Sequence, residues 1–129
     1  MSPMDYEAAE EVYRDLGRYV AGAVGDGWES ARLVAEIEDD ESGTLYGMYR
    51  YTEDGAVEAG QFDPSPDAYL LFERLRAVTG HPDYGPWTTA VFKLDADLRF
   101  SVDFSYGPLD PDEGPWDRAD RVEREMLAE

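Results

Sequence analysis

Cysteine is absent from the chain, and histidine occurs once among its 129 residues. Without cysteine the chain has no disulfide, no thiolate nucleophile and no cysteine-ligated zinc site. The lone His81 has no Gly-x-Ser-x-Gly sequence and no second histidine to work with as a general base. It stands between Gly80 and Pro82, where we expect a helix to end, so we interpret it as a surface-loop residue near a helix C-terminus.

Basic residues are also scarce. Eleven Lys and Arg stand against 30 Asp and Glu, which gives a formal net charge of −19 at pH 7. Such a charge repels the phosphates of nucleic acids and the surface of anionic membranes. It favours a cationic partner and accelerates its arrival. We therefore expect a protein partner, with no direct contact to nucleic acid or membrane.

Long hydrophobic runs are missing as well, since no apolar stretch approaches the roughly 20 residues that cross a bilayer. Residues 1–10 are acidic and lack the basic and apolar regions of a signal peptide. Together with the absence of cysteine, this leads us to expect a cytoplasmic protein. Aromatic residues, in contrast, make up 13% of the chain. Disordered acidic segments are poor in aromatics, so we expect residues 1–129 to fold as one domain.

The first half of the chain alternates between helical and strand periodicity. Apolar residues recur at spacings of three and four between residues 3 and 24, which predicts an amphipathic helix. From Ala31 to Ile37 apolar and polar residues alternate, which is typical of a half-buried strand. A second strand is expected over residues 44–52 and a third over about 56–62, joined at Asp54-Gly55, a hairpin signal.

The second half begins with a helix start, because Ser65 is a good N-cap and Pro66 suits the first helical position. That helix should extend to about Val78. The clearest strands follow over residues 87–94 and 99–106, and a last helix is expected over residues 115–127, with Trp116 among the residues that face the core. The order α-β-β-β-α-β-β-α predicts an α+β fold, with one antiparallel five-stranded sheet and the helices packed on one face in two layers.

Residues 85–106 carry a distinctive pattern. A Trp-Thr pair opens it at Trp87, a strand ends in Leu94-Asp95, and after a turn the chain reads Phe-x-Val-Asp-Phe-x-Tyr from Phe100 to Tyr106. This stretch resembles the signature of the YezG-like antitoxin and immunity proteins. The family usually has glycine in the turn where this chain has Leu98, and the last helix matches only loosely.

The resemblance implies a cytoplasmic protein that binds and neutralises a cognate polymorphic toxin, in related systems often a nuclease carried on a secreted protein. Nucleases that grip phosphate backbones are basic. An acidic binder could therefore cover such a surface by placing carboxylates where phosphates would sit. The resemblance implies neither an enzyme nor a cofactor.

Two acidic sets are candidate contacts with a toxin. The first set lies at the end of the first strand and in the following turn, where charges can project into solvent; its members are Glu36, Glu38, Asp39, Asp40 and Glu41. The second is Asp103, on the polar face of the last strand. Both sets have a plain alternative as solvated surface. Mutual repulsion among the acids lowers stability, and a carboxylate surface for the Arg and Lys of a partner is a benefit that could offset it.

Aromatic residues in the strands are either core residues or interface anchors. Tyr46 and Tyr49 have opposite parity, so a regular strand directs them to opposite faces. We predict that one of them, with Tyr49 as the candidate, is exposed and contacts the partner.

A metal site is not expected. Asp95-Ala96-Asp97 begins like a calcium loop, but the fifth, sixth and twelfth positions of such a loop are Arg99, Phe100 and Tyr106 here. An EF-hand requires an oxygen ligand, a glycine and a glutamate at those positions. A hairpin turn accounts better for this segment.

Three functions remain open from the sequence. The first is an immunity protein that blocks a basic toxin. The second is an acidic interaction module with another basic client, which gene neighbourhood would distinguish from the first. The third is a hydrolase with paired carboxylates, for which a deep pocket holding two carboxylates would be the sign.

Overall fold

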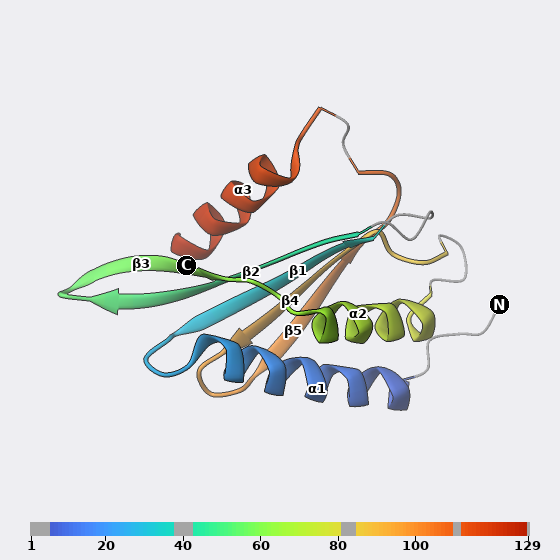
Figure 1. Cartoon of the computed structure of the whole chain (residues 1–129), viewed down its shortest axis with the longest axis horizontal. Coiled ribbons are helices and arrows are strands. Elements are labelled where there is room, and N and C mark those ends of the chain that lie inside the picture. Colours follow the sequence, from blue (N-terminus) through green and yellow to red (C-terminus); the bar gives the residue numbers. More distant parts are fainter. Residues whose placement is uncertain (1–5, 38–42, 81–84, 110–111, 129) are drawn as a thin grey trace.

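The computed structural model describes residues 6–37, 43–80, 85–109 and 112–128. Five antiparallel strands form one sheet in the order β3-β2-β1-β4-β5, which confirms the predicted α+β order and sheet (Figure 1). The elements are α1 (Tyr6–Val24), β1 (Ser30–Ile37), β2 (Gly43–Glu53), β3 (Ala56–Phe62), α2 (Pro66–Val78), β4 (Thr89–Asp95), β5 (Phe100–Ser105) and α3 (Pro115–Leu127).

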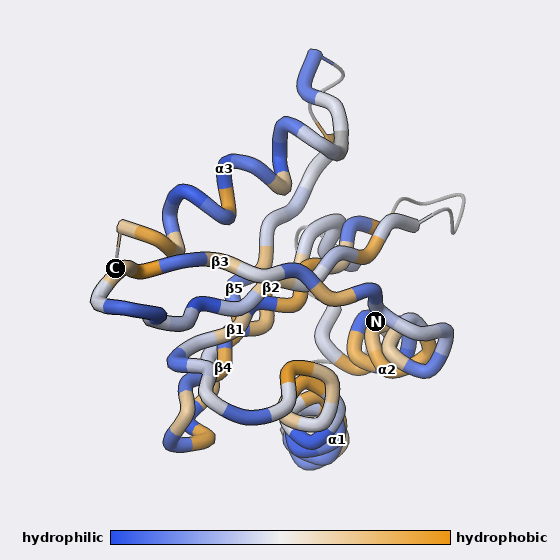
Figure 2. The backbone as a smooth tube through the Cα atoms, turned by 60° about the vertical axis from the view of Figure 1, so that its left-hand side comes forward, coloured by the Kyte–Doolittle hydropathy of each residue, from blue (hydrophilic) through white to orange (hydrophobic). Residues whose placement is uncertain are grey.

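Strand β1 is the centre of the sheet, and its alternating residues define two faces. Leu33 pairs with Gly47 of β2 and with Phe92 of β4, and this face, which we call the core face, is covered by α1 and α2. Val34 and Glu36 point to the opposite face, which we call the α3 face. Figure 2 shows α1 and α2 on one side of the sheet and α3 on the other.

The core face buries a continuous apolar cluster. The amphipathic stripes of α1 and α2 pack against alternate residues of the central strands, and every member is at most 3% exposed. The members include Val12, Leu16, Val20, Leu33, Ile37, Phe72, Leu75, Phe92 and Leu94. Burying each large side chain contributes about 1.5–3 kcal/mol, so this face supplies most of the apolar stabilisation. In the described part of the chain, none of the helices is both long and apolar enough to traverse a bilayer.

Trp87 is the tryptophan of the signature, and it is a core residue. It is fully buried, with its ring stacked on Phe104 at 5.7 Å between centroids and edge-on to Phe72 at 6.2 Å. Its indole N–H donates to Thr79 Oγ1 at 3.0 Å, and the Thr79 hydroxyl donates to the Leu75 carbonyl at the end of α2. A buried indole needs such a partner, so Thr79 both caps α2 and satisfies Trp87.

Helix α3 corrects the prediction that all helices share one face. It lies against β2 and β3 on the side of the sheet opposite α1 and α2. Its apolar contacts are a small cluster of Val122 and Met126 against Val34 and Met48. Strand β1, expected to be half-buried, is therefore buried on both faces from Ala31 to Ile37.

The β2–β3 turn and the β4–β5 turn each place a residue with a side chain in left-handed backbone geometry. Asp54 has φ 51° and Gly55 has φ 80°, which suits the two-residue loop predicted from Asp-Gly. Leu98, between β4 and β5, has φ 66°. This is the position where the family usually has glycine, and an L-residue there carries a steric penalty of about 1–2 kcal/mol.

Candidate functional site

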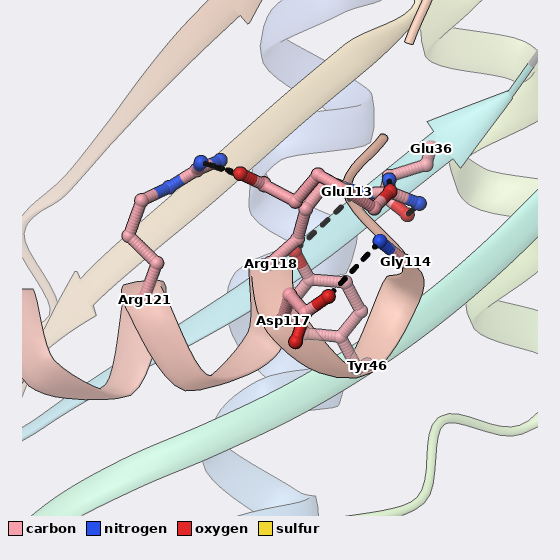
Figure 3. Close-up of polar contacts among 7 residues, drawn as sticks. All are labelled: Glu36, Tyr46, Glu113, Gly114, Asp117, Arg118 and Arg121. Carbon is pink, nitrogen blue, oxygen red and sulfur yellow. Dashed lines mark hydrogen bonds and ion pairs between the residues drawn. The ribbon is translucent and has the colours of Figure 1, made fainter. Parts of the chain in front are cut away.

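The start of α3 is attached to the sheet by a buried ion pair. The guanidinium of Arg118 donates to both oxygens of Glu36, with Nη2–Oε1 at 2.9 Å, and Nη1 donates to the carbonyl of Glu113 (Figure 3). Glu36 is 2% exposed and Arg118 is 9% exposed. The hydroxyl of Tyr46 lies 3.5 Å from Glu36 Oε2. The carboxylate thus has bidentate charge-assisted bonds, the arrangement that best compensates burial of a charge.

Two further ion pairs hold the same helix. Arg121 Nη1 donates to a Glu113 carboxylate oxygen at 2.6 Å, and Arg32 Nη1 lies 3.4 Å from Glu125 Oε2. Arg118, Val122 and Glu125 recur at spacings of four and three, so they lie on one side of α3. That side meets the sheet through charges at both ends and apolar residues between them.

The N-terminus of α3 is capped by its own sequence. Asp117 Oδ2 accepts from the backbone N–H of Gly114 at 3.3 Å (Figure 3), and Pro115 occupies the first turn, where no N–H partner is needed. The carboxylate also lies near the positive end of the helix dipole. These contacts begin the helix at a defined residue and so set where Trp116 and Arg118 point.

The electrostatics of this network are structural in character. Burial, and then the neighbouring charge of Glu36, raise the pKa of Tyr46 well above its ordinary value. The hydrogen bonds to Glu36 raise the pKa of Arg118 further above its already high value. Tyr46 therefore stays neutral and Arg118 stays charged at neutral pH, which suits their hydrogen bonds to Glu36.

Of the acidic residues predicted to contact a toxin, the structure describes Glu36 and Asp103. Glu36 was expected to project into solvent at the strand end, and this is wrong: α3 covers it, and Arg118 takes both of its oxygens. Glu38, Asp39, Asp40 and Glu41 lie outside the described residues. Asp103 is exposed on the α3 face of β5, where its carboxylate is 65% exposed and lies 2.9 Å from Lys93 Nζ.

Tyr49 lies on the core face, away from Asp103. It packs against the main core, half-buried, and its ring crosses Gly60 of the neighbouring strand, where a Cβ would clash with it. Tyr46 lies on the α3 face and is also half-buried. The prediction that the two tyrosines lie on opposite faces of the sheet is confirmed. The prediction that one of them is exposed is wrong, because helices cover both faces.

Trp116 is the exposed aromatic residue that sequence reasoning placed in the core. It is 82% exposed. Its spacing to Ala119, Val122 and Met126 is helical, so the sequence pattern alone favoured burial. The buried carboxylate of Glu36 requires Arg118 to face the sheet, and Trp116, two residues earlier, is then directed to solvent.

Trp116 borders a cavity of about 220 Å³ between α3 and the ends of β2 and β3. Its walls are mostly apolar and include Tyr46, Met48, Phe62 and Pro64, and Asp63 also lines it. We call this site the Trp116 cavity. A concave apolar surface with an exposed tryptophan on its rim is typical of an interface anchor point.

Three further cavities bear on the alternative of a hydrolase with paired carboxylates. They lie at Arg32, at Tyr69 and at Tyr106. Like the Trp116 cavity, each is lined by no more than one carboxylate residue, whereas glycoside hydrolysis requires two. Over the described ranges, no group of three or more His, Cys, Asp or Glu is placed to share a metal ion.

The segment from Asp95 has a structural role instead. Asp95 Oδ1 accepts from the backbone N–H groups of Asp97 and Arg99, at 3.0 and 2.9 Å. The carboxylate thereby stabilises the turn between β4 and β5. This confirms the interpretation of the Asp-Ala-Asp sequence as a hairpin turn.

Comparison with known proteins identifies two relatives. The chain is 24% identical over 115 residues, 78% of its length and 69% of the relative, to the type VII secretion system protein EsaG of Staphylococcus aureus. It is 28% identical over 116 residues, 80% of its length and 71% of the relative, to the immunity protein YezG of Bacillus spizizenii. No protein-family model matches the chain. The two relatives confirm the resemblance to the YezG-like proteins that the second hairpin indicated.

Proposed function

We propose, from its similarity to YezG and EsaG over about four fifths of its length, that this chain is an immunity protein that binds and neutralises a cognate toxin. That similarity is the observation that carries the proposal. At 78–80% of the chain, it extends well beyond the signature at residues 85–106. The function is binding, and no reaction is required of the chain.

The finer proposal is that the toxin surface is basic, as in a nuclease, and that carboxylates of this chain occupy the place of phosphates. The net charge of −19 supports it. Exposed carboxylates lie on every layer of the fold, with Glu10 on α1, Glu58 on β3, Asp103 on β5 and Asp120 on α3. Such a field accelerates the encounter with a basic protein and repels nucleic acid. We also propose that the encounter takes place in the cytoplasm.

The burial of Glu36 argues against a direct contact between this residue and a toxin. A residue that is 2% exposed and paired with Arg118 offers almost no surface to a toxin. We propose that Glu36 acts indirectly, by fixing α3, and that the exposed residues of α3 and β5 make the contact. Asp103 remains a candidate because its carboxylate is accessible.

The test is capture of the toxin domain encoded beside this gene, followed by an assay of its activity. We expect a stable complex, inactive toxin and an association rate that falls steeply as salt rises. Asp103→Asn should slow association several-fold, and Asp67→Asn, an exposed acid on the opposite side of the sheet, is the matched charge control. Absence of a complex, or a complex that leaves the toxin active, would refute the function. A salt-independent association rate would refute the electrostatic part alone.

A second candidate, an acidic module with a basic client that is no toxin, rests on the charge alone. The activity assay separates the two functions. If the neighbouring protein is bound but has no toxicity that binding removes, the second function is favoured.

A further inference from the structure

We propose that the Trp116 cavity receives an arginine side chain of the partner, whose guanidinium stacks on Trp116 and pairs with Asp63. This inference rests on the proposed function, because it takes the partner to be a basic toxin. It adds a specific contact to a proposal that otherwise depends on overall charge.

The exposure of Trp116 favours a partner at this site. At 82% exposed, its ring stands almost wholly in water although apolar walls lie beside it. Burying an aromatic ring is one of the largest single sources of apolar free energy. Tryptophan is also the residue most enriched among the anchors of protein interfaces. A partner that covers Trp116 therefore gains more than it would over any other exposed side chain of α3.

The chemistry of the Trp116 cavity suits an arginine side chain. Its lining includes Tyr46 and Met48 of the α3 face, and this apolar surface suits the three methylenes of an arginine stem. The exposed residues Asp63 and Trp116 also line it, and the exposed Asp120 lies one helical turn after Trp116. A planar guanidinium both stacks on an aromatic face and bonds a carboxylate bidentately, whereas a lysine ammonium does neither as well.

The charge near the cavity is complementary to an arginine side chain. The cations of α3 nearest this end, Arg118 and Arg121, are bound to Glu36 and Glu113. Among the described residues, neither Asp63 nor Asp120 forms an ion pair. In a chain of net charge −19, an incoming cation is attracted to these carboxylates and an anion is repelled.

The buried contacts of α3 preorganise the site. The bidentate Arg118–Glu36 pair and the cap at Asp117 hold the first turns of α3 against the sheet, and Tyr46 belongs both to that network and to the cavity wall. A site whose walls are already fixed loses less entropy when it binds. The buried network thus has a consequence at the surface, since it sets the position of the anchor.

The experiment compares variants of the full chain in capture of the adjacent toxin domain, with the dissociation constant as readout. Trp116→Ala should weaken capture by about tenfold or more and Asp63→Asn by about threefold, and Trp116→Phe should retain most of the affinity. Leu70→Ala and Asp67→Asn are the matched controls on α2, one for exposed apolar area and one for charge, and both should bind as the parent does. Because Trp116 is exposed, the thermal midpoint of each variant should stay within about 2 °C.

A direct probe uses Nα-acetyl-arginine amide, followed by NMR of the indole N–H signals. The signal lost in Trp116→Ala identifies Trp116, and that signal should shift with the arginine probe at millimolar concentration. The neutral citrulline analogue, which has the same shape, should shift it much less.

Four results would overturn the inference. The first is that Trp116→Ala captures the toxin as well as the parent does, and the second is that the arginine and citrulline probes shift the indole signal equally. The third is that the α2 control variants lose as much affinity as the cavity variants. The fourth is that the parent chain forms dimers that Trp116→Ala dissociates, because the occupant of the cavity would then be a second copy of the chain. If the parent chain captures no toxin at all, the proposed function fails first. Capture that is insensitive to Trp116 leaves that function intact and refutes the arginine site alone.

Discussion

The two faces of the sheet are held to their helices by different physics. On the core face, α1 and α2 bury a continuous apolar cluster in which most side chains have no contact with water. On the α3 face, two apolar residues of the helix meet Val34 and Met48, and ion pairs from Arg118 and Arg32 complete the contact. Apolar packing stabilises the fold in proportion to the area it buries, whereas a buried ion pair mainly determines how two elements are positioned.

This difference explains how α3 is positioned by so small an apolar contact. A buried ion pair adds little net stability relative to apolar residues of the same volume, but removing one partner leaves a buried charge and costs about 3–5 kcal/mol. The buried carboxylate of Glu36 therefore disfavours any position of α3 in which Arg118 does not pair with it. We therefore expect substitutions on the core face to lower stability through the side-chain volume they remove. On the α3 face, we expect them to lower stability when they leave a charged residue without its partner.

The largest effect is expected from the core face. Phe92→Ala removes a fully buried ring under α1 and should lower the free energy of unfolding by about 3–5 kcal/mol in urea titrations. Leu70→Ala, on the solvent side of α2, should change it by less than about 0.5 kcal/mol. Equal losses for the two variants would mean that the core face is not the principal source of stability.

The second prediction separates charge from area on the α3 face. Arg118→Met should lower the free energy of unfolding by about 3 kcal/mol, because it leaves the Glu36 carboxylate buried and unpaired. Adding Glu36→Met should restore most of that loss, because both polar partners are then gone. A double variant less stable than the single one would show that the ion pair stabilises by attraction and does more than select the docked geometry.

The third prediction uses alkaline pH, because Tyr13 contacts the core face and Tyr46 the α3 face. Burial raises the pKa of both tyrosines in the folded state, Tyr46 the more strongly. A raised folded pKa contributes stability that is present below about pH 10, the unfolded value, and is lost as pH rises above it. Tyr46→Phe should therefore flatten the fall in unfolding free energy between about pH 10 and 12 more than Tyr13→Phe does. The reverse order would place the stronger burial on the core face.

The fourth prediction concerns the turn that joins the two signature strands. Leu98→Gly should raise the free energy of unfolding by about 1 kcal/mol, because glycine adopts φ near 66° without the steric penalty of a Cβ. Leu98→Ala retains the Cβ and should give no such increase. Equal stabilisation by both substitutions would locate the effect in the exposed leucine side chain.

The smallest effect is expected at the exposed end of the α3 face. Asp103→Asn breaks an ion pair with Lys93 that is largely open to solvent, so the free energy of unfolding should fall by less than about 1 kcal/mol. Raising the salt concentration should shrink this difference further. A loss comparable with that of Arg118→Met would mean that exposure does not distinguish the two pairs.

Predictions from the sequence are confirmed where the residue pattern of a segment depends only on that segment's own secondary structure. The stripe of α1, the Asp54-Gly55 turn and the alternation of Phe92 with its neighbours each describe a local period or a local backbone requirement. The signature at residues 85–106 likewise indicated the family before any contact was known, and its tryptophan proved to be a core residue.

Predictions from the sequence failed where one segment's role depends on another far away in the chain. From the sequence, Glu36 is an exposed charge at a strand end, but in the structure Arg118 covers it. From the sequence, Trp116 is a core residue, but in the structure Arg118 occupies the side of α3 that faces the sheet. Periodicity shows that a helix has an apolar side but does not say which face of the sheet receives it.

The sequence alone determined the eight elements, their antiparallel order and the strongly acidic character of the protein, because these follow from local periodicity and from counting charges. The tertiary structure decided that α3 lies opposite α1 and α2, that Glu36 is buried and that Trp116 is exposed. The physical reason is that a buried charge can be compensated only by a partner brought to it by the fold, and no local pattern encodes that partner's approach.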